Sequence, residues 1–196
     1  MNSSRKRLGR IRGLMKERGI DLYIIPVNDP HLGEYVPDHW RIIAWLTGFT
    51  GSAATVVVTD TFAGLWTDSR YFVQAQNQLT DSGFQFMKPL MNDNKDFIDW
   101  LSDNVRNEST IGVDGRTLSI GKMRKIERSL DGKEVKLITD ADLISEIWND
   151  RPPMPLSEAF DFPVSLCGKD RVIKIAEVRE KMIRHKIDYH LLTSID

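Results

Sequence analysis

Four histidines and one cysteine are the side chains of this 196-residue chain that most readily bind metals or act as nucleophiles. Their spacing includes no His-Glu-x-x-His motif and no cysteine pair, which are the usual zinc patterns. His31, Glu34, Asp38 and His39 gather in one polar segment, but polar loops are common and neither helical nor Cys-x-x-Cys spacing supports a metal site there. Cys167 has no neighbouring histidine to activate it. We therefore expect no catalytic residue and no metal site in this chain.

The glycine-rich segment Gly48-Phe-Thr-Gly51-Ser52 invites comparison with a phosphate-binding loop. Such a loop follows a strand, opens a helix and carries a lysine next to Ser or Thr. This segment instead follows a predicted helix, precedes a predicted strand and has no lysine. We expect a tight turn whose backbone approaches a neighbour closely.

A positively charged residue, Arg70, is predicted to lie in the first turn of a helix. Asp68 or Ser69 is expected to cap this helix, which reaches Leu79. A cation in that turn faces the positive end of the helix dipole, which is unfavourable by ~0.3–1 kcal/mol if the side chain is exposed. A salt bridge to Asp68 or Glu34, or solvation, would compensate.

The elements that position these residues follow from hydrophobic spacing and turn signals. In the first half of the chain we predict a helix at 4–18 ending near Gly19, a buried strand at 22–26, a turn-rich loop at 27–38, helical spacing at 39–46, and strands at 53–59 and 62–67. Only Asp60 and Thr61 separate the last two strands, so these should form an antiparallel hairpin, because a helical crossover needs far more residues.

Strands and helices then alternate along the chain. We predict strands at 84–88, 111–113 and 135–138, and helices at 96–105, 119–130 and 142–148. In the helix at 119–130, Ile120, Met123 and Ile126 should face inward. Alternating elements combined with one hairpin predict an α/β domain with a mixed sheet.

The C-terminal part of the chain repeats its beginning after a break. Residues 149–155 contain three of the eight prolines and predict a semi-rigid linker. Residues 11–25 then align without a gap on 178–192, with identities at the positions of Arg12, Met15, Ile20 and Asp21. We therefore predict one domain at 1–150, a Pro-rich linker at 151–167, and the truncated start of a second domain of the same type at 168–196.

Composition places the chain among ordinary globular proteins. It has 41% hydrophobic and 28% charged residues and a formal net charge of −1, which excludes collagen-like and disordered classes and gives no general attraction to nucleic acid or anionic membranes. The sequence contains no run of 18 apolar residues and therefore predicts no membrane span. The basic start of the chain is similar to a mitochondrial presequence, but its helical apolar stripe favours a surface helix. A single cysteine suits a reducing compartment, and we expect the cytoplasm.

Five segments resemble the N-terminal part of cytosolic-type, three-domain Xaa-Pro aminopeptidases (aminopeptidase P), which belong to the creatinase/prolidase superfamily. The similar segments are 24–36, 48–54, 65–75, 111–114 and 147–152, and they include Trp66-Thr-Asp-Ser-Arg-Tyr-Phe72 and Ile147-Trp-Asn-Asp-Arg-Pro152. Two departures are visible, because Ser69 and Ala54 stand where the family usually has glycine. Negative φ angles at both positions would accommodate them.

The resemblance implies a creatinase/prolidase-type N-terminal domain, with a mixed sheet of about six strands flanked by helices. A second domain of the same kind follows in that family. A third domain, with the pita-bread fold, uses two Asp, one His and two Glu to bind two divalent metal ions, usually manganese, which activate a water. The enzyme removes an N-terminal residue that precedes proline. None of those ligands can be assigned to this sequence, so the chain alone is expected to be inactive.

The resemblance also implies which residues and partners matter. Arg70, His31, Glu34 and Tyr35 are candidates for the rim of the substrate site, where Arg70 would help to orient the peptide. The implied partners are a peptide with proline at its second position, the missing second and catalytic domains, and in some cases a second copy in a homodimer. The domain would shape substrate access, subunit contacts or both. Alternatives are a non-catalytic interaction module and the N-domain of a related creatinase or prolidase.

Overall fold

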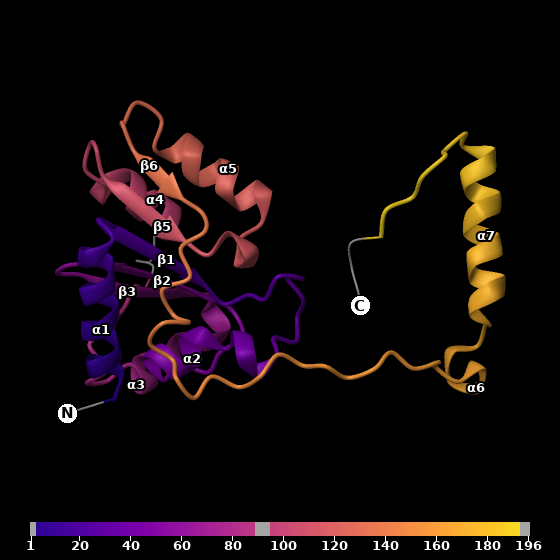
Figure 1. Ribbon diagram of the computed structural model, residues 1–196, viewed down its shortest axis with the longest axis horizontal. Coiled ribbons are helices and arrows are strands. Elements are labelled where there is room, and N and C mark those ends of the chain that lie inside the picture. Colours follow the sequence, from indigo (N-terminus) through magenta and orange to yellow (C-terminus); the bar gives the residue numbers. More distant parts are fainter. Residues whose placement is uncertain (1–2, 89–94, 193–196) are drawn as a thin grey trace. The chain divides into compact units, whose positions relative to one another are not determined.

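The computed structural model describes residues 3–88 and 95–192, in two compact units, Met1–Met154 and Pro155–Asp196 (Figure 1). The first unit contains one six-stranded sheet with the order β4-β3-β2-β1-β5-β6. Its strands are β1 (Leu22–Pro26), β2 (Ala54–Thr59), β3 (Ala63–Thr67), β4 (Gln85–Phe86), β5 (Thr110–Val113) and β6 (Lys136–Ile138). The pairs β1–β2 and β2–β3 are antiparallel, and the other three pairs are parallel. The predicted mixed α/β sheet and its hairpin are therefore confirmed.

Helices cover both faces of this sheet, and the alternation of side chains along β1 explains how. Tyr23 and Ile25 belong to a core formed with α1 (Ser3–Glu17), α2 (Ile42–Thr47) and α3 (Phe72–Gln78). Leu22 and Ile24 point to the other face and pack in a core formed with α4 (Phe97–Asn104) and α5 (Ile120–Ser129). Every residue of β1 is buried, as expected for a central strand covered on both sides.

Local signals marked most ends of the elements correctly. Gly19 has a φ of +61°, and the Ile20 N–H donates to the Met15 carbonyl at 2.8 Å, which closes α1 as predicted. Asp68 caps its segment as predicted, but the first turn that it caps is a 3-10 turn, Ser69–Tyr71, which precedes α3. A second 3-10 turn, Asp38–Trp40, precedes α2, because the backbone at Arg41 (ψ 49°) leaves the helical region.

Two predictions about the helices are wrong. Residues 142–148 form turns rather than a helix, because tertiary contacts hold them: the buried Tyr23 hydroxyl donates to the Ala141 carbonyl at 2.7 Å and accepts from the Leu143 N–H at 3.3 Å. Burial also raises the pKa of Tyr23. Ile120 is 72% exposed, and the stripe of α5 that packs inward begins one turn later, at Met123.

The second unit contains α6 (Val164–Cys167) and α7 (Arg171–Arg184). The end of α7 repeats the end of α1: the Ile187 N–H donates to the Met182 carbonyl at 2.9 Å, and Lys186 has a φ of +55°. The repeat aligns residues 189–192 with Leu22–Ile25 of β1 and so predicts a strand after this helix, but residues 186–192 form none. A strand needs a neighbouring strand for its hydrogen bonds, and residues 155–192 provide none.

Helix α7 is expected to exchange its amide hydrogens much faster than the sheet. Its apolar residues, including Val172, Ile175 and Val178, are exposed, whereas the same stripe of α1 is buried. Packing of an apolar face supplies most of the stability of a helix. Hydrogen exchange of the dilute monomeric chain should show residues 171–184 far less protected than residues 54–59 in the same sample. Equal protection would contradict the interpretation that α7 lacks its natural packing partner.

None of the helices formed by residues 3–88 and 95–192 combines the length and apolarity that crossing a bilayer requires.

Candidate functional site

Three loops meet at one end of the strands β1, β2 and β3 because of the directions in which these strands run. β1 ends at Pro26, which pairs with Thr55, and β2 begins at Ala54, which pairs with Thr67 at the end of β3. The loops at 27–41, 48–53 and 68–71 therefore emerge together. Between the first two of these loops lies a cleft of about 220 Å³.

The cleft brings together residues from segments that the sequence singled out. Glu34, Tyr35 and Arg41 line it from the loop after β1, and Gly51 and Ser52 line it from the glycine-rich segment. Glu34 and Tyr35 are exposed, and Tyr35 keeps 84% of its surface accessible. The cleft therefore offers a carboxylate, a guanidinium, a hydroxyl and an aromatic ring within a small space.

The glycine-rich segment is held as a rigid wall by the side chains of α3. The Thr50 N–H donates to Gln78 Oε1 at 3.0 Å, and the Nε2 atoms of Gln74 and Gln78 donate to Thr50 Oγ1 at 2.9 and 3.1 Å. Gly51 has no room for a side chain, because a Cβ atom there would lie 2.8 Å from Phe49 Cε1 and 2.9 Å from Tyr71 Cδ1. The predicted tight turn with a close backbone approach is confirmed.

Arg70 lies next to this wall. Its Nε and Nη2 donate to the two carboxylate oxygens of Asp68 at 3.0 and 2.8 Å, and its guanidinium lies 5.2 Å from the Tyr71 ring centroid. Tyr71 in turn shares a hydrogen bond of 2.8 Å with Ser52 Oγ. The bonds from Arg70 lower the pKa of Asp68, and the same pair raises the pKa of Arg70, to which the charge of Glu34 adds a smaller contribution. The pairing of Arg70 with Asp68 offsets the predicted unfavourable position of its charge.

The loop after β1 is folded around the buried Asp29. Asp29 Oδ1 accepts hydrogen bonds from the N–H groups of His31 and Gly33 at 3.1 and 3.3 Å. This turn exposes His31, which does not line the cleft. The structure thus gathers Glu34 and Tyr35 in the cleft, places Arg70 beside it through Tyr71 and Ser52, and leaves His31 apart.

The polar residues of this loop do not form a metal site in the part of the chain that the structure describes. There, no three His, Cys, Asp or Glu side chains are grouped so that they could hold a metal ion. His39 instead contacts the Pro152 carbonyl through Nδ1 at 2.7 Å. The residues present therefore do not fit the dinuclear metal centre that the resemblance implies elsewhere in the protein.

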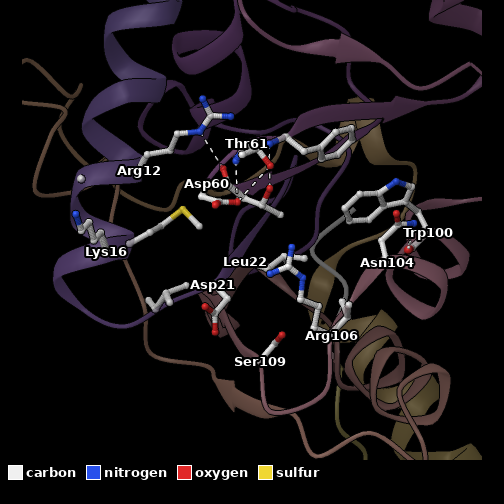
Figure 2. Close-up of a pocket in the computed structure, with 16 residues that line it drawn as sticks. Arg12, Lys16, Asp21, Leu22, Asp60, Thr61, Trp100, Asn104, Arg106 and Ser109 are labelled. Carbon is white, nitrogen blue, oxygen red and sulfur yellow. Dashed lines mark hydrogen bonds between the residues drawn. The ribbon is translucent and has the colours of Figure 1, made fainter.

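A larger cleft, of about 800 Å³, lies at the opposite end of these strands, between α1, the β2–β3 turn and the segment from α4 to β5 (Figure 2). Its two acids serve the fold. Asp21 Oδ2 accepts the Thr110 N–H at 2.7 Å, and Asp60 Oδ1 accepts the Thr61 N–H at 2.8 Å. Burial lowers the pKa of Arg12, whose Nε donates to the Thr59 carbonyl at 2.9 Å. No motif predicted this cleft, because its residues come from three separated stretches, 12–22, 59–62 and 100–109, without a common pattern.

The residues that support the first cleft are not among the predicted site residues. Gln74, Gln78 and Tyr71 hold its wall, yet they read as ordinary residues of a surface helix. Only Tyr71 and Gln74 belong to the similar segment at 65–75, and Gln78 lies outside it. The two departures from the family pattern are accommodated as expected, because neither Ser69 nor Ala54 is among the described residues with positive φ.

Comparison with known proteins identifies relatives over the whole chain. A family model described as the creatinase/prolidase N-terminal domain matches residues 7–147. The chain is 33% identical to aminopeptidase P1 of Lotus japonicus over 96% of its own length and 29% of that protein, and 32% identical to a probable Xaa-Pro aminopeptidase P of Laccaria bicolor over 97% and 30%. It is also similar to the crystal structure of an X-prolyl aminopeptidase of Caenorhabditis elegans, a cytosolic enzyme with a di-nuclear active site. The TM-score is 0.84 and the identity 31%, and the match covers 96% of this chain and 32% of that one. The chain thus spans about a third or less of the length of these relatives.

Proposed function

The chain belongs to the creatinase/prolidase N-terminal domain family, and from this membership we propose that it is the non-catalytic N-terminal part of a metal-dependent aminopeptidase that removes the residue preceding proline. The observation that carries the proposal is the similarity to the Caenorhabditis elegans X-prolyl aminopeptidase over nearly the whole chain. The chain corresponds to 32% of that enzyme. The catalytic centre is therefore assigned to the part of the parent protein that this chain does not span.

The metal centre of the parent protein is also assigned to the part that this chain does not span. Two divalent ions, with manganese as the expected metal, would supply an activated water there. The residues of this chain would act before that step, by shaping the access of the peptide. The parent protein is proposed to work in the cytoplasm, which the single cysteine and the cytosolic relative support.

The cleft and Arg70 are proposed to contact the part of a peptide substrate that follows its proline. The Arg70 side chain is 67% exposed, and its Nη1 is not used in the pair with Asp68, so it can donate to a peptide carbonyl or a terminal carboxylate. Glu34 can accept from a peptide N–H, and the exposed ring of Tyr35 can cover an apolar side chain. His31, which lies apart from the cleft, would contribute only at the outer rim.

The proposed domain organisation keeps a first domain at 1–150, a linker at 151–167 and the beginning of a second domain at 168–196. The repeated ends of α1 and α7 support it. The exposed apolar stripe of α7 would then pack on the sheet of that second domain. A homodimer of the parent protein remains part of the proposal, and its test is the mass of the full-length protein in solution.

The chain of residues 1–196 is expected to hydrolyse no peptide by itself, because the described residues hold no metal ligand set. The test incubates it with Mn²⁺ and a peptide of the Xaa-Pro-Xaa type, and the full-length protein at the same concentration is the control. The full-length protein should release the first residue, whereas the chain alone should match the blank. Hydrolysis by the chain, or stoichiometric metal retained by it after dialysis, would contradict the proposal.

A further inference from the structure

A buried arginine near the end of the first unit lies between two tryptophan rings. The guanidinium of Arg151 is 5.0 Å from the Trp40 ring centroid and 5.6 Å from the Trp148 ring centroid, and the side chain is only 8% exposed. A second guanidinium, that of Arg116, also lies 5.0 Å from Trp40. Two carboxylates balance these charges: Asp114 Oδ2 is 2.7 Å from Arg116 Nη2, and Asp142 Oδ2 is 2.6 Å from Arg116 Nη2 and 3.8 Å from Arg151 Nη1.

Two short segments exchange hydrogen bonds at this point. Arg151 Nε donates to the His39 carbonyl at 2.7 Å. His39 Nδ1 lies 2.7 Å from the Pro152 carbonyl, and since a carbonyl only accepts, Nδ1 is the donor. We call His39, Trp40, Arg151 and Pro152 the clasp. It joins the loop that carries Glu34 and Tyr35 to the first residues of the proline-rich segment.

Stability alone does not account for this arrangement. Arg151 Nη2 is buried, and no acceptor lies within hydrogen-bonding distance of it among the described residues, which costs free energy. Burial also lowers the pKa of Arg151, because it disfavours the charged form. An apolar side chain of similar volume often stabilises such a position as well as a buried charge does. The arginine also makes the contact directional. Its planar guanidinium holds the N–H groups in fixed directions, so the His39 carbonyl can accept from it in only one position.

From these contacts we infer that the clasp sets the position and direction in which the chain leaves the first unit relative to the loop at 27–41. Pro152 within the clasp and Pro153 directly after it have restricted φ angles, which limits the directions that the backbone can take at this point. His39 and Arg151 are therefore positioning residues for peptide hydrolysis by the full-length protein, through the alignment of the cleft with the domains that follow. This role rests on the function proposed above.

The test uses the full-length protein with the variants Arg151→Met, His39→Ala and His39→Gln. Arg151→Met keeps the length of the side chain and removes its hydrogen bonds, and His39→Gln restores a donor toward Pro152. Arg18→Ala is the control, because it removes an arginine of the first unit that is outside the clasp and forms an exposed ion pair with Glu146 at 2.7 Å. The readouts are kcat/KM for an Xaa-Pro tripeptide and an Xaa-Pro heptapeptide, and hydrogen exchange at residues 147–151, where the N–H groups of Ile147, Trp148 and Arg151 donate to backbone carbonyls.

Arg151→Met and His39→Ala should speed exchange at residues 147–151 while β2 stays protected. They should lower kcat/KM for the heptapeptide about tenfold more than for the tripeptide, as loss of alignment predicts, and His39→Gln should recover most of the loss. If exchange rises but both peptides respond as they do in Arg18→Ala, the clasp has only a local structural role and the inference is wrong. If the unmodified full-length protein cleaves neither peptide, the proposed function itself fails, which the same assay distinguishes.

Discussion

Replacing Arg70 by alanine in the full-length protein is expected to lower kcat/KM for Xaa-Pro peptides of five or more residues by roughly ten- to a hundredfold. The proposed contact that this variant removes is a charge-assisted hydrogen bond to the peptide, which a water cannot replace with the same geometry. The melting temperature should change little. The pair with Asp68 is exposed on both sides, and exposed ion pairs contribute little to stability.

Two companion variants show which property of Arg70 matters. Arg70→Lys keeps the charge but not the planar fork, so it should recover only part of the loss if the contact is directional. Arg5→Ala breaks a comparable exposed contact, with Asp81, far from the cleft in sequence, and should leave both kinetics and melting unchanged. Unchanged kinetics in Arg70→Ala would make Arg70 a structural residue. A large fall in melting temperature would assign its role to the pair with Asp68.

Gly51→Ala is expected to destabilise the chain by about 1–3 kcal/mol, the usual cost of overpacking a filled site. The new Cβ would lie 2.8 Å from Phe49 Cε1 and 2.9 Å from Tyr71 Cδ1. Phe49 is completely buried and cannot move aside without disturbing the core. Tyr71 would shift away from Ser52, so the wall of the cleft would also lose its hydrogen bond. Chemical denaturation followed by tryptophan fluorescence measures the change.

Gly9→Ala is the matched control for this substitution. Gly9 lies inside α1, and a Cβ atom there meets no other atom within 4 Å. Alanine favours a helix over glycine by roughly 0.5–1 kcal/mol, so this variant should be more stable than the unmodified chain. The two Gly→Ala changes should therefore move the denaturation midpoint in opposite directions. A shift of the same sign and size in both would show that crowding at Gly51 is not the cause.

The fold could be predicted where the residues of a short segment are enough to decide its structure. The continuous apolar run at Leu22–Pro26 predicted a strand buried on both faces, and Asp60-Thr61 predicted the hairpin, because two residues permit only an antiparallel return. Gly19 ends α1 because glycine adopts positive φ at no steric cost. For the candidate site, the resemblance of short segments to a known family singled out Arg70, His31, Glu34 and Tyr35; Glu34 and Tyr35 line one cleft, and the role of all four stays a prediction.

Local patterns were therefore enough to predict most of the elements, their order and the family, because these depend on neighbours within a few positions along the chain. Other features depend on contacts between distant parts of the chain. Residues 142–148 have helical spacing, yet Tyr23 and Asp142 hold them as turns. Residues 189–192 have the pattern of a strand, yet form none without a neighbouring strand. The clasp joins His39 to Arg151 and Pro152, and both of these lie more than a hundred residues after His39 in the chain. Contacts of this range depend on how the sheet brings its loops together, and no local pattern records that.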